Sequence, residues 1–123
     1  MNLLDTDIII ELLREKRHET GAISIITLIE LLRGIKATKR KKVKQLLEES
    51  FTVENLDNKT IETYCSLYEN LKKQGETLPD ADLLIAATAI TQNMTLKTKD
   101  QHYQRLTKTG LKLTPQPQNI ENI

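Results

Sequence analysis

The sequence is poor in the residues that build disulfide scaffolds, zinc sites and stacking surfaces: it has one cysteine, two histidines, no tryptophan and an aromatic content of 3%. Cys65 cannot form an intramolecular disulfide, and its helical surroundings favour a half-buried reduced thiol over a nucleophile. His18 and His102 are scattered, without zinc-like spacing. A small aromatic fraction also leaves few platforms on which nucleic-acid bases could stack.

Long apolar runs and clustered glycines are absent as well. The apolar runs at 8–10 and 83–87 are far too short to span a membrane, and no basic-then-apolar leader opens the chain, so we expect a cytoplasmic protein with no membrane contact. The glycines lie far apart, which argues against a phosphate-binding loop. No serine stands in a nucleophile-elbow sequence, which disfavours that class of hydrolase.

Charge is balanced overall, with a formal net charge of +1, but it is unevenly placed. Basic residues crowd one segment, and at helical spacing four of them form a basic stripe: Arg33, Lys36, Arg40 and Lys44. We favour the solvated face of a helix whose other side holds Val43, Leu46 and Leu47. A phosphate-facing edge is the alternative, since nucleic-acid affinity follows the local concentration of positive charge.

The 123 residues fit a single domain, 1–123, that can bury its own core. Apolar patterns predict strands at 1–4, 22–26, 51–56, 94–98 and 111–113. They predict helices at 8–17, from 27 to 49 with a weak point at 34–38, and at 58–74, 80–92 and 101–108. The helix at 58–74 is expected to turn five side chains inward: Ile61, Tyr64, Cys65, Tyr68 and Leu71. The tail from about 114 is expected to be irregular.

Strands that alternate with helices imply an α/β fold, a three-layer α/β/α domain with a mostly parallel sheet of four to five strands. Ligands bind such sheets beyond the carboxyl ends of the strands. Asp5, Glu30 and Asp100 each follow an apolar strand within a few residues. Asp82 begins the helix at 80–92, which is apolar around nearly its whole circumference and is expected to be buried. We therefore expect the four acids at one edge of the sheet.

Each acid also has an ordinary structural explanation. Asp5 fits a strand-end turn, because aspartate satisfies turn backbone groups locally. Thr27 and Glu30 fit a helix capping box. The other acids fit helix N-caps, with the candidates Asp80, Asp82 and Asp100.

The joint arrangement favours chemistry over capping alone. Several carboxylates within a few ångströms cannot all stay ionised unless their repulsion is compensated. A hard divalent cation such as Mg²⁺ or Mn²⁺ provides that compensation and prefers oxygen ligands. The positive end of the helix at 80–92 also helps to keep Asp82 charged. The sequence therefore predicts a metal-dependent hydrolase site.

Four motifs carry a resemblance that spans nearly the whole chain. They are Asp5-Thr6-Asp7 after the first strand, Thr27-x-x-Glu30-Leu31-x-x-Gly34, Asp82-Leu83-Leu84-Ile85-Ala86-Ala87, and Leu96-x-Thr98-x-Asp100. In this order and spacing the chain resembles the PIN-domain family, and within it the VapC-type toxins of toxin–antitoxin pairs. Lys97 departs from the apolar residue usual on the last core strand.

The resemblance implies a function and a site. It implies an endoribonuclease that leaves 5′-phosphate and 3′-hydroxyl ends, often a homodimer, neutralised by a VapB-like antitoxin. The residues implied to hold Mg²⁺ or Mn²⁺ are Asp5, Glu30, Asp82 and Asp100. Thr6 and Thr98 correspond to polar neighbours of the first and last acids, and Asp7 and Asp80 are extra acids for the outer shell.

Two other functions remain open from the sequence. Asp5 and Asp7 fit the nucleophile and acid of a haloacid-dehalogenase-like phosphatase, although Glu30 and Asp82 then have no task. A non-catalytic RNA- or partner-binding module of the same fold would gain nothing from repelling carboxylates.

Overall fold

A five-stranded parallel sheet forms the centre of the protein. The computed structural model describes residues 1–115. The expectation of an irregular tail from about residue 114 therefore lies almost entirely outside the described residues. The strands are β1 (Asn2–Leu4), β2 (Ala22–Ser24), β3 (Thr52–Glu54), β4 (Thr95–Lys97) and β5 (Lys112–Leu113). They lie in the order β3-β2-β1-β4-β5, and every neighbouring pair is parallel. The predicted parallel sheet is confirmed.

Helices fill the connections between the strands. They are α1 (Thr6–Arg14), α2 (Ile25–Arg33), α3 (Ala37–Ser50), α4 (Asn58–Lys73), α5 (Asp80–Thr91) and the 3₁₀ helix η1 (Gln101–Thr109). The weak point predicted at 34–38 is the break between α2 and α3. Within residues 1–115, no helix combines the length and apolarity that a membrane span requires.

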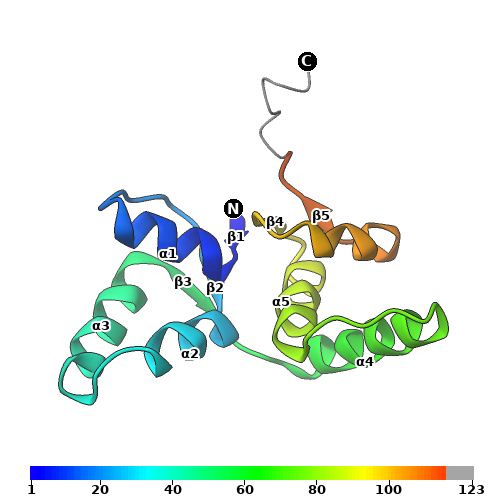
Figure 1. The fold of residues 1–123 in the computed structure, drawn as a ribbon, viewed down its shortest axis with the longest axis horizontal. Coiled ribbons are helices and arrows are strands. Elements are labelled where there is room, and N and C mark those ends of the chain that lie inside the picture. Colours follow the sequence, from blue (N-terminus) through cyan, green and yellow to red (C-terminus); the bar gives the residue numbers. More distant parts are fainter. Residues whose placement is uncertain (116–123) are drawn as a thin grey trace.

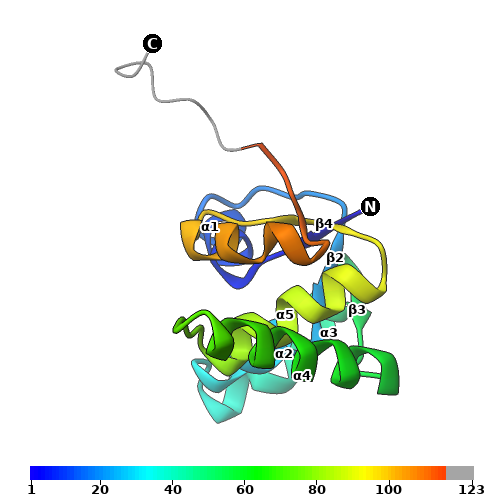
Figure 2. The ribbon, with the colours of Figure 1, turned by 90° about the vertical axis from the view of Figure 1, so that its right-hand side faces the viewer.

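The two faces of the sheet bury separate apolar clusters because successive strand residues point to opposite sides. Leu3 packs with α4, α5 and η1, whereas Leu4 packs with α1, α2 and α3. Figure 1 shows these two groups of helices on either side of the sheet, and Figure 2 shows α4 and α5 side by side. This arrangement is the predicted three-layer α/β/α fold.

Helix α4 buries a different face from the one predicted. Ile61 is 48% exposed, Tyr68 is 50% exposed and Cys65 is exposed, so the prediction that these side chains point inward is wrong. The buried residues are Thr60, Leu67 and Leu71. The Thr60 and Thr91 hydroxyls form a 2.9 Å hydrogen bond between α4 and α5, which fixes the rotation of α4 about its axis.

Helix α3 is more exposed than its sequence pattern suggested. Leu47 is 1% exposed and Val43 is partly buried, but Leu46 is 55% exposed, contrary to prediction. The helix contacts the rest of the protein along a narrow stripe, since Leu47 is its one fully buried residue among those described. The predicted solvated face is therefore wider than the basic stripe alone.

Candidate metal centre

Asp5 lies at the carboxyl end of the central strand, where parallel pairing sets its neighbours. Leu4 pairs with Lys97, so the next residues, Asp5 and Thr98, lie side by side. The Asp5 backbone N–H donates to Lys97 O at 2.9 Å, and the Thr98 hydroxyl donates to Asp5 Oδ2 at 2.6 Å. Asp5 Oδ1 accepts from the Thr6 N–H at 2.9 Å, which makes Asp5 the N-cap of α1 in place of the predicted turn.

The Asp5 carboxylate is held where its charge is poorly solvated. Burial is the main cause that raises its pKa from 3.8 to about 6, and the nearby carboxylates of Asp7 and Asp82 add to the rise. The hydrogen bonds from Thr98 and Thr6 oppose the rise. Asp5 therefore carries a negative charge at neutral pH that a bound cation would stabilise.

Glu30 reaches the same edge from α2. The N-cap of α2 is Ser24, whose Oγ accepts from Ile26 N at 3.0 Å, so the predicted capping box with Thr27 and Glu30 is wrong. The helix begins three residues earlier than that box requires, and Glu30 lies within its second turn. The Thr6 hydroxyl donates to Glu30 Oε1 at 2.8 Å. Glu30 is thereby tied to the residue that follows Asp5.

Asp82 comes to the site from the first turn of α5. The N-cap position of α5 is Pro79, without a side-chain cap, so the capping explanation for Asp80 and Asp82 is wrong. Burial raises the pKa of Asp82, and the charges of Asp100 and Glu30 raise it further. Asp80 instead accepts a 2.7 Å hydrogen bond from the Tyr64 hydroxyl of α4. Asp82, and not Asp80, is the acid of α5 that interacts with the other acids.

Asp100 is both a cap and a member of the acidic group. Its Oδ1 accepts from the His102 N–H at 2.9 Å and lies 2.9 Å from His102 Nδ1, so the predicted N-cap of the following helix is confirmed. The Asp100 backbone N–H donates to Thr98 Oγ1 at 3.0 Å. The charge of Asp100 also raises the pKa of Asp82, so Asp100 interacts with the other acids of the site while it caps η1.

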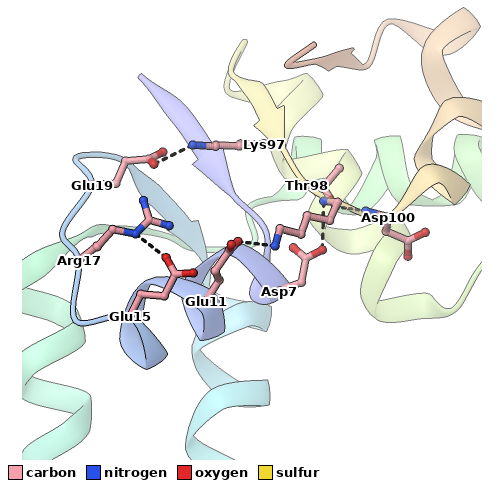
Figure 3. Close-up of polar contacts among 9 residues, drawn as sticks. Asp7, Glu11, Glu15, Arg17, Glu19, Lys97, Thr98 and Asp100 are labelled. Atoms are coloured by element: carbon pink, nitrogen blue, oxygen red, sulfur yellow. Dashed lines mark hydrogen bonds and ion pairs between the residues drawn. The ribbon is translucent and has the colours of Figure 1, made fainter. Parts of the chain in front are cut away.

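A row of polar contacts ties α1 and the loop that follows it to β4 beside this edge (Figure 3). Asp7 Oδ2 accepts from the Lys99 backbone N–H at 3.0 Å, and Lys99 Nζ lies 2.6 Å from Glu11 Oε2. Lys97, which departs from the family pattern, pairs with Glu19 at 2.7 Å. A partly buried lysine is therefore accommodated on β4 by an ion pair at the sheet surface.

Tyr103 is a residue of the site that the sequence did not single out. It lies on η1, is 1% exposed, and its hydroxyl has no hydrogen-bond partner among residues 1–115. Burial raises the pKa of the phenol, and four carboxylates raise it further: Asp5, Asp82, Asp100 and Asp7. The only signal in the sequence was the apolar spacing of Tyr103 and Leu106 after Asp100.

The donor set fits a hard divalent cation by its chemistry. The side chains that interact at this edge present carboxylate and hydroxyl oxygens, the ligand type that Mg²⁺ and Mn²⁺ prefer. Within residues 1–115, no three His, Cys, Asp or Glu side chains are gathered closely enough to hold an ion as they stand. Mg²⁺ usually takes one or two carboxylates and retains water in the rest of its shell, so it does not require three.

Comparison with known proteins places the chain in a family. The model of the PIN domain matches residues 3–109. Ribonuclease VapC1 of Methanocaldococcus jannaschii is 41% identical over 115 residues, which cover 90% of this chain and 85% of the relative. Ribonuclease VapC of Rickettsia bellii is 35% identical over 115 residues, covering 80% of this chain and 86% of the relative.

Solved structures agree with the sequence comparison. VapBC-1 from nontypeable Haemophilus influenzae matches with a TM-score of 0.79 and 27% identity, over 92% of this chain and 96% of that one. VapBC2 from Rickettsia felis, bound to a DNA fragment from its promoter, matches with a TM-score of 0.79 and 25% identity, over 94% and 98% of the two chains. With the matched family model, these similarities show that the chain belongs to the PIN domain family, where its relatives include VapC ribonucleases.

Proposed function

We propose that this protein is a divalent-metal-dependent endoribonuclease and the toxin of a VapBC-type toxin–antitoxin pair. The single observation that carries the proposal is the electrostatic coupling of carboxylates from separate elements at the carboxyl edge of the sheet, with Asp5 buried at its centre. Relatives at 41% and 35% identity that are named ribonuclease VapC support the same activity.

We assign the metal ligands from this geometry. Asp5 and Asp82 would hold the ion, because burial disfavours the charged form of each carboxylate and a cation would compensate for it. Glu30 and Asp100 would complete the acidic set around the ion. Thr98 fixes the rotamer of Asp5, and Thr6 fixes that of Glu30. Such outer hydrogen bonds hold ligand oxygens in the geometry that an ion requires.

The chemistry follows from this arrangement. When bound, Mg²⁺ or Mn²⁺ supplies a lowered pKa for coordinated water and stabilises charge on the phosphoryl oxygens. The carboxylates at this edge of the sheet would orient a water molecule in line with the scissile phosphate. In the hydrolysis, a P–O bond to a water oxygen would form as the P–O3′ bond breaks. The attacking water would release one proton to the solvent, and the O3′ leaving group would take up one proton. The products are a 5′-phosphate and a 3′-hydroxyl.

The same carboxylates repel RNA when no cation is bound, so positive charge nearby would assist binding. Arg33 is the member of the basic stripe closest to the site in sequence and contact, with its guanidinium 3.7 Å from Glu30 Oε2. Its side chain is 72% exposed and accessible to a phosphate. We assign Arg33 to substrate binding at the edge of the acidic group.

The proposed partners are a VapB-like antitoxin and a second copy of the chain, in the cytoplasm. The solved relatives from Haemophilus influenzae and Rickettsia felis are VapBC assemblies, which supports the antitoxin. The homodimer rests on the family resemblance. Light scattering of the purified chain, alone and after coexpression with the neighbouring antitoxin gene, tests both partners.

The test of the activity is cleavage of an RNA panel that includes tRNA and rRNA fragments, with Mn²⁺, Mg²⁺ or EDTA. We expect cleavage by the wild type that is lost in EDTA and in Asp5→Asn. In parallel, Mn²⁺ should raise the Tm once its concentration exceeds the Kd. A Tm that stays flat across millimolar Mn²⁺, with no cleavage, would contradict the metal site and leave the non-catalytic binding module.

The phosphatase alternative is not supported. The PIN domain match extends over residues 3–109, and Glu30 and Asp82, which had no task in a phosphatase, interact with the other acids. Turnover of a generic phosphomonoester without any action on RNA would be needed to revive it.

A further inference from the structure

The Tyr103 hydroxyl is buried, has no hydrogen-bond partner among residues 1–115, and lies within the electrostatic influence of the acidic group. Its residue is 1% exposed, and the ring packs with the cluster formed by α4, α5 and the inner face of the sheet. A buried hydroxyl without a hydrogen-bond partner is destabilising, and a phenyl ring would fill the same space without that penalty. The packing of the ring therefore does not explain the hydroxyl.

The surroundings of the hydroxyl indicate what it can bind. The carboxylates around it oppose loss of its proton, so the phenol stays a neutral donor. Among these carboxylates, Asp82 is the one whose pKa the Tyr103 phenol lowers. No carboxylate oxygen among residues 1–115 completes a hydrogen bond with the Tyr103 hydroxyl. Asp82 is therefore the carboxylate with which the O–H group interacts most directly.

The other acids of the site show a matching pattern. Asp5 accepts from the Thr98 hydroxyl at 2.6 Å, and Glu30 accepts from the Thr6 hydroxyl at 2.8 Å. A carboxylate that binds a metal with one oxygen commonly accepts a hydrogen bond at the other, which fixes its orientation. Tyr103 is placed to provide this donor for Asp82.

We propose that Tyr103 is a positioning residue whose hydroxyl donates to the Asp82 carboxylate when Asp82 turns toward a divalent cation. The inference rests on the proposed metal site and extends it to a residue on η1. The proposed hydrogen bond would supply the partner that the buried Tyr103 hydroxyl lacks among residues 1–115.

The test is Mn²⁺ binding to the full chain, measured by water-proton relaxation, with Tm measured in EDTA. Tyr103→Phe removes the hydroxyl and keeps the ring. We expect its Mn²⁺ Kd to rise about 10–100-fold, with a metal-free Tm that is unchanged or higher. Tyr68→Phe is the matched control, because Tyr68 is 50% exposed on α4, and it should leave the Kd unchanged.

A double-mutant cycle tests whether Tyr103 acts through Asp82. In an Asp82→Asn background, Tyr103→Phe should weaken Mn²⁺ binding by less than twofold. An equal loss in both backgrounds would overturn the proposal, as would wild-type affinity in Tyr103→Phe. Weaker binding accompanied by a lower metal-free Tm would show a structural role and also overturn it. If the wild type itself bound no Mn²⁺, the metal site and this inference would fail together, whereas the other outcomes leave the metal site standing.

Discussion

The Thr98 hydroxyl donates a 2.6 Å hydrogen bond to Asp5 Oδ2 across 93 residues of sequence. The same Thr98 oxygen accepts from the Asp100 backbone N–H at 3.0 Å. One hydroxyl therefore connects the first and last acids of the site and holds them in register at the ends of β1 and β4. Replacing it should disturb both acids at once.

Thr98→Val should impair the site and lower stability. The variant removes a donor to a buried carboxylate and an acceptor for a backbone N–H, so we expect a loss of about 1–3 kcal/mol in the free energy of unfolding. Cleavage should fall about 10–100-fold because Asp5 loses its fixed orientation. Urea denaturation and initial cleavage rates measure the two effects. Thr98→Ser, which keeps the hydroxyl, is the control and should retain most activity; equal loss in both variants would contradict the assignment.

Asp5→Asn and Asp82→Asn should abolish cleavage without unfolding the protein. Each removes a proposed metal ligand, for which we expect a loss of at least about 100-fold. Asparagine is as good an N-cap as aspartate, so α1 should persist in Asp5→Asn. Cleavage assays with circular dichroism test this. The control is Glu62→Gln, which neutralises an exposed acid on α4 and should cleave normally. If either variant unfolded, the replaced aspartate would be required for folding, which would contradict its assignment as a metal ligand only.

Stability without metal should fall as pH rises from about 4 to about 6. The unfolded chain releases the Asp5 proton near 3.8, whereas the folded protein retains it until its raised pKa of about 6. The folded state binds more protons in this window, so the free energy of unfolding decreases with pH there and levels off above it. The difference between the unfolded and folded pKa values of Asp5 corresponds to a loss of at most about 3 kcal/mol in the free energy of unfolding.

Urea denaturation in EDTA at several pH values isolates this effect when wild type is compared with Asp5→Asn. The wild type should lose stability relative to the variant across the window, and Asp5→Asn should be the more stable protein at pH 7.5. Parallel stability curves for the two proteins would show that Asp5 titrates normally.

Lys44→Gln should leave the salt dependence of RNA binding unchanged. Lys44 pairs with Glu48 at 2.5 Å along α3, and Arg40 donates to the carbonyls of Leu32 and Ile35, so these members of the basic stripe have partners within the chain. Binding of a short RNA to Asp5→Asn protein over a range of KCl concentrations gives the slope. If the slope of log K against log[KCl] were smaller by about 1 in Lys44→Gln, Lys44 would contact a phosphate and the prediction would be wrong. Arg33→Gln is the comparison expected to reduce the slope, because the Arg33 side chain is 72% exposed and its 3.7 Å contact with Glu30 Oε2 is longer than the 2.5 Å contact between Lys44 and Glu48.

The strands and most helices follow from local pattern, and the errors have local causes too. Apolar runs bounded by glycine and polar residues located all five strands. The face of α4 was misjudged because Ile61 and Tyr68 are apolar by type, whereas the buried contact with α5 runs through Thr60. A threonine that buries its hydroxyl by pairing across helices has no apolar signature in the sequence.

The sequence by itself determined the α/β class and the parallel sheet, and it predicted the four acids as a candidate site, because hydrophobic periodicity and strand-end position are properties of short segments. Only the tertiary structure decided which hydroxyls donate to these acids, Thr98 to Asp5 and Thr6 to Glu30, and that Tyr103 is buried where its phenol acts on Asp82. It also decided that Asp80 turns to α4. These relationships depend on strand register and helix rotation, which bring together residues that no local pattern connects.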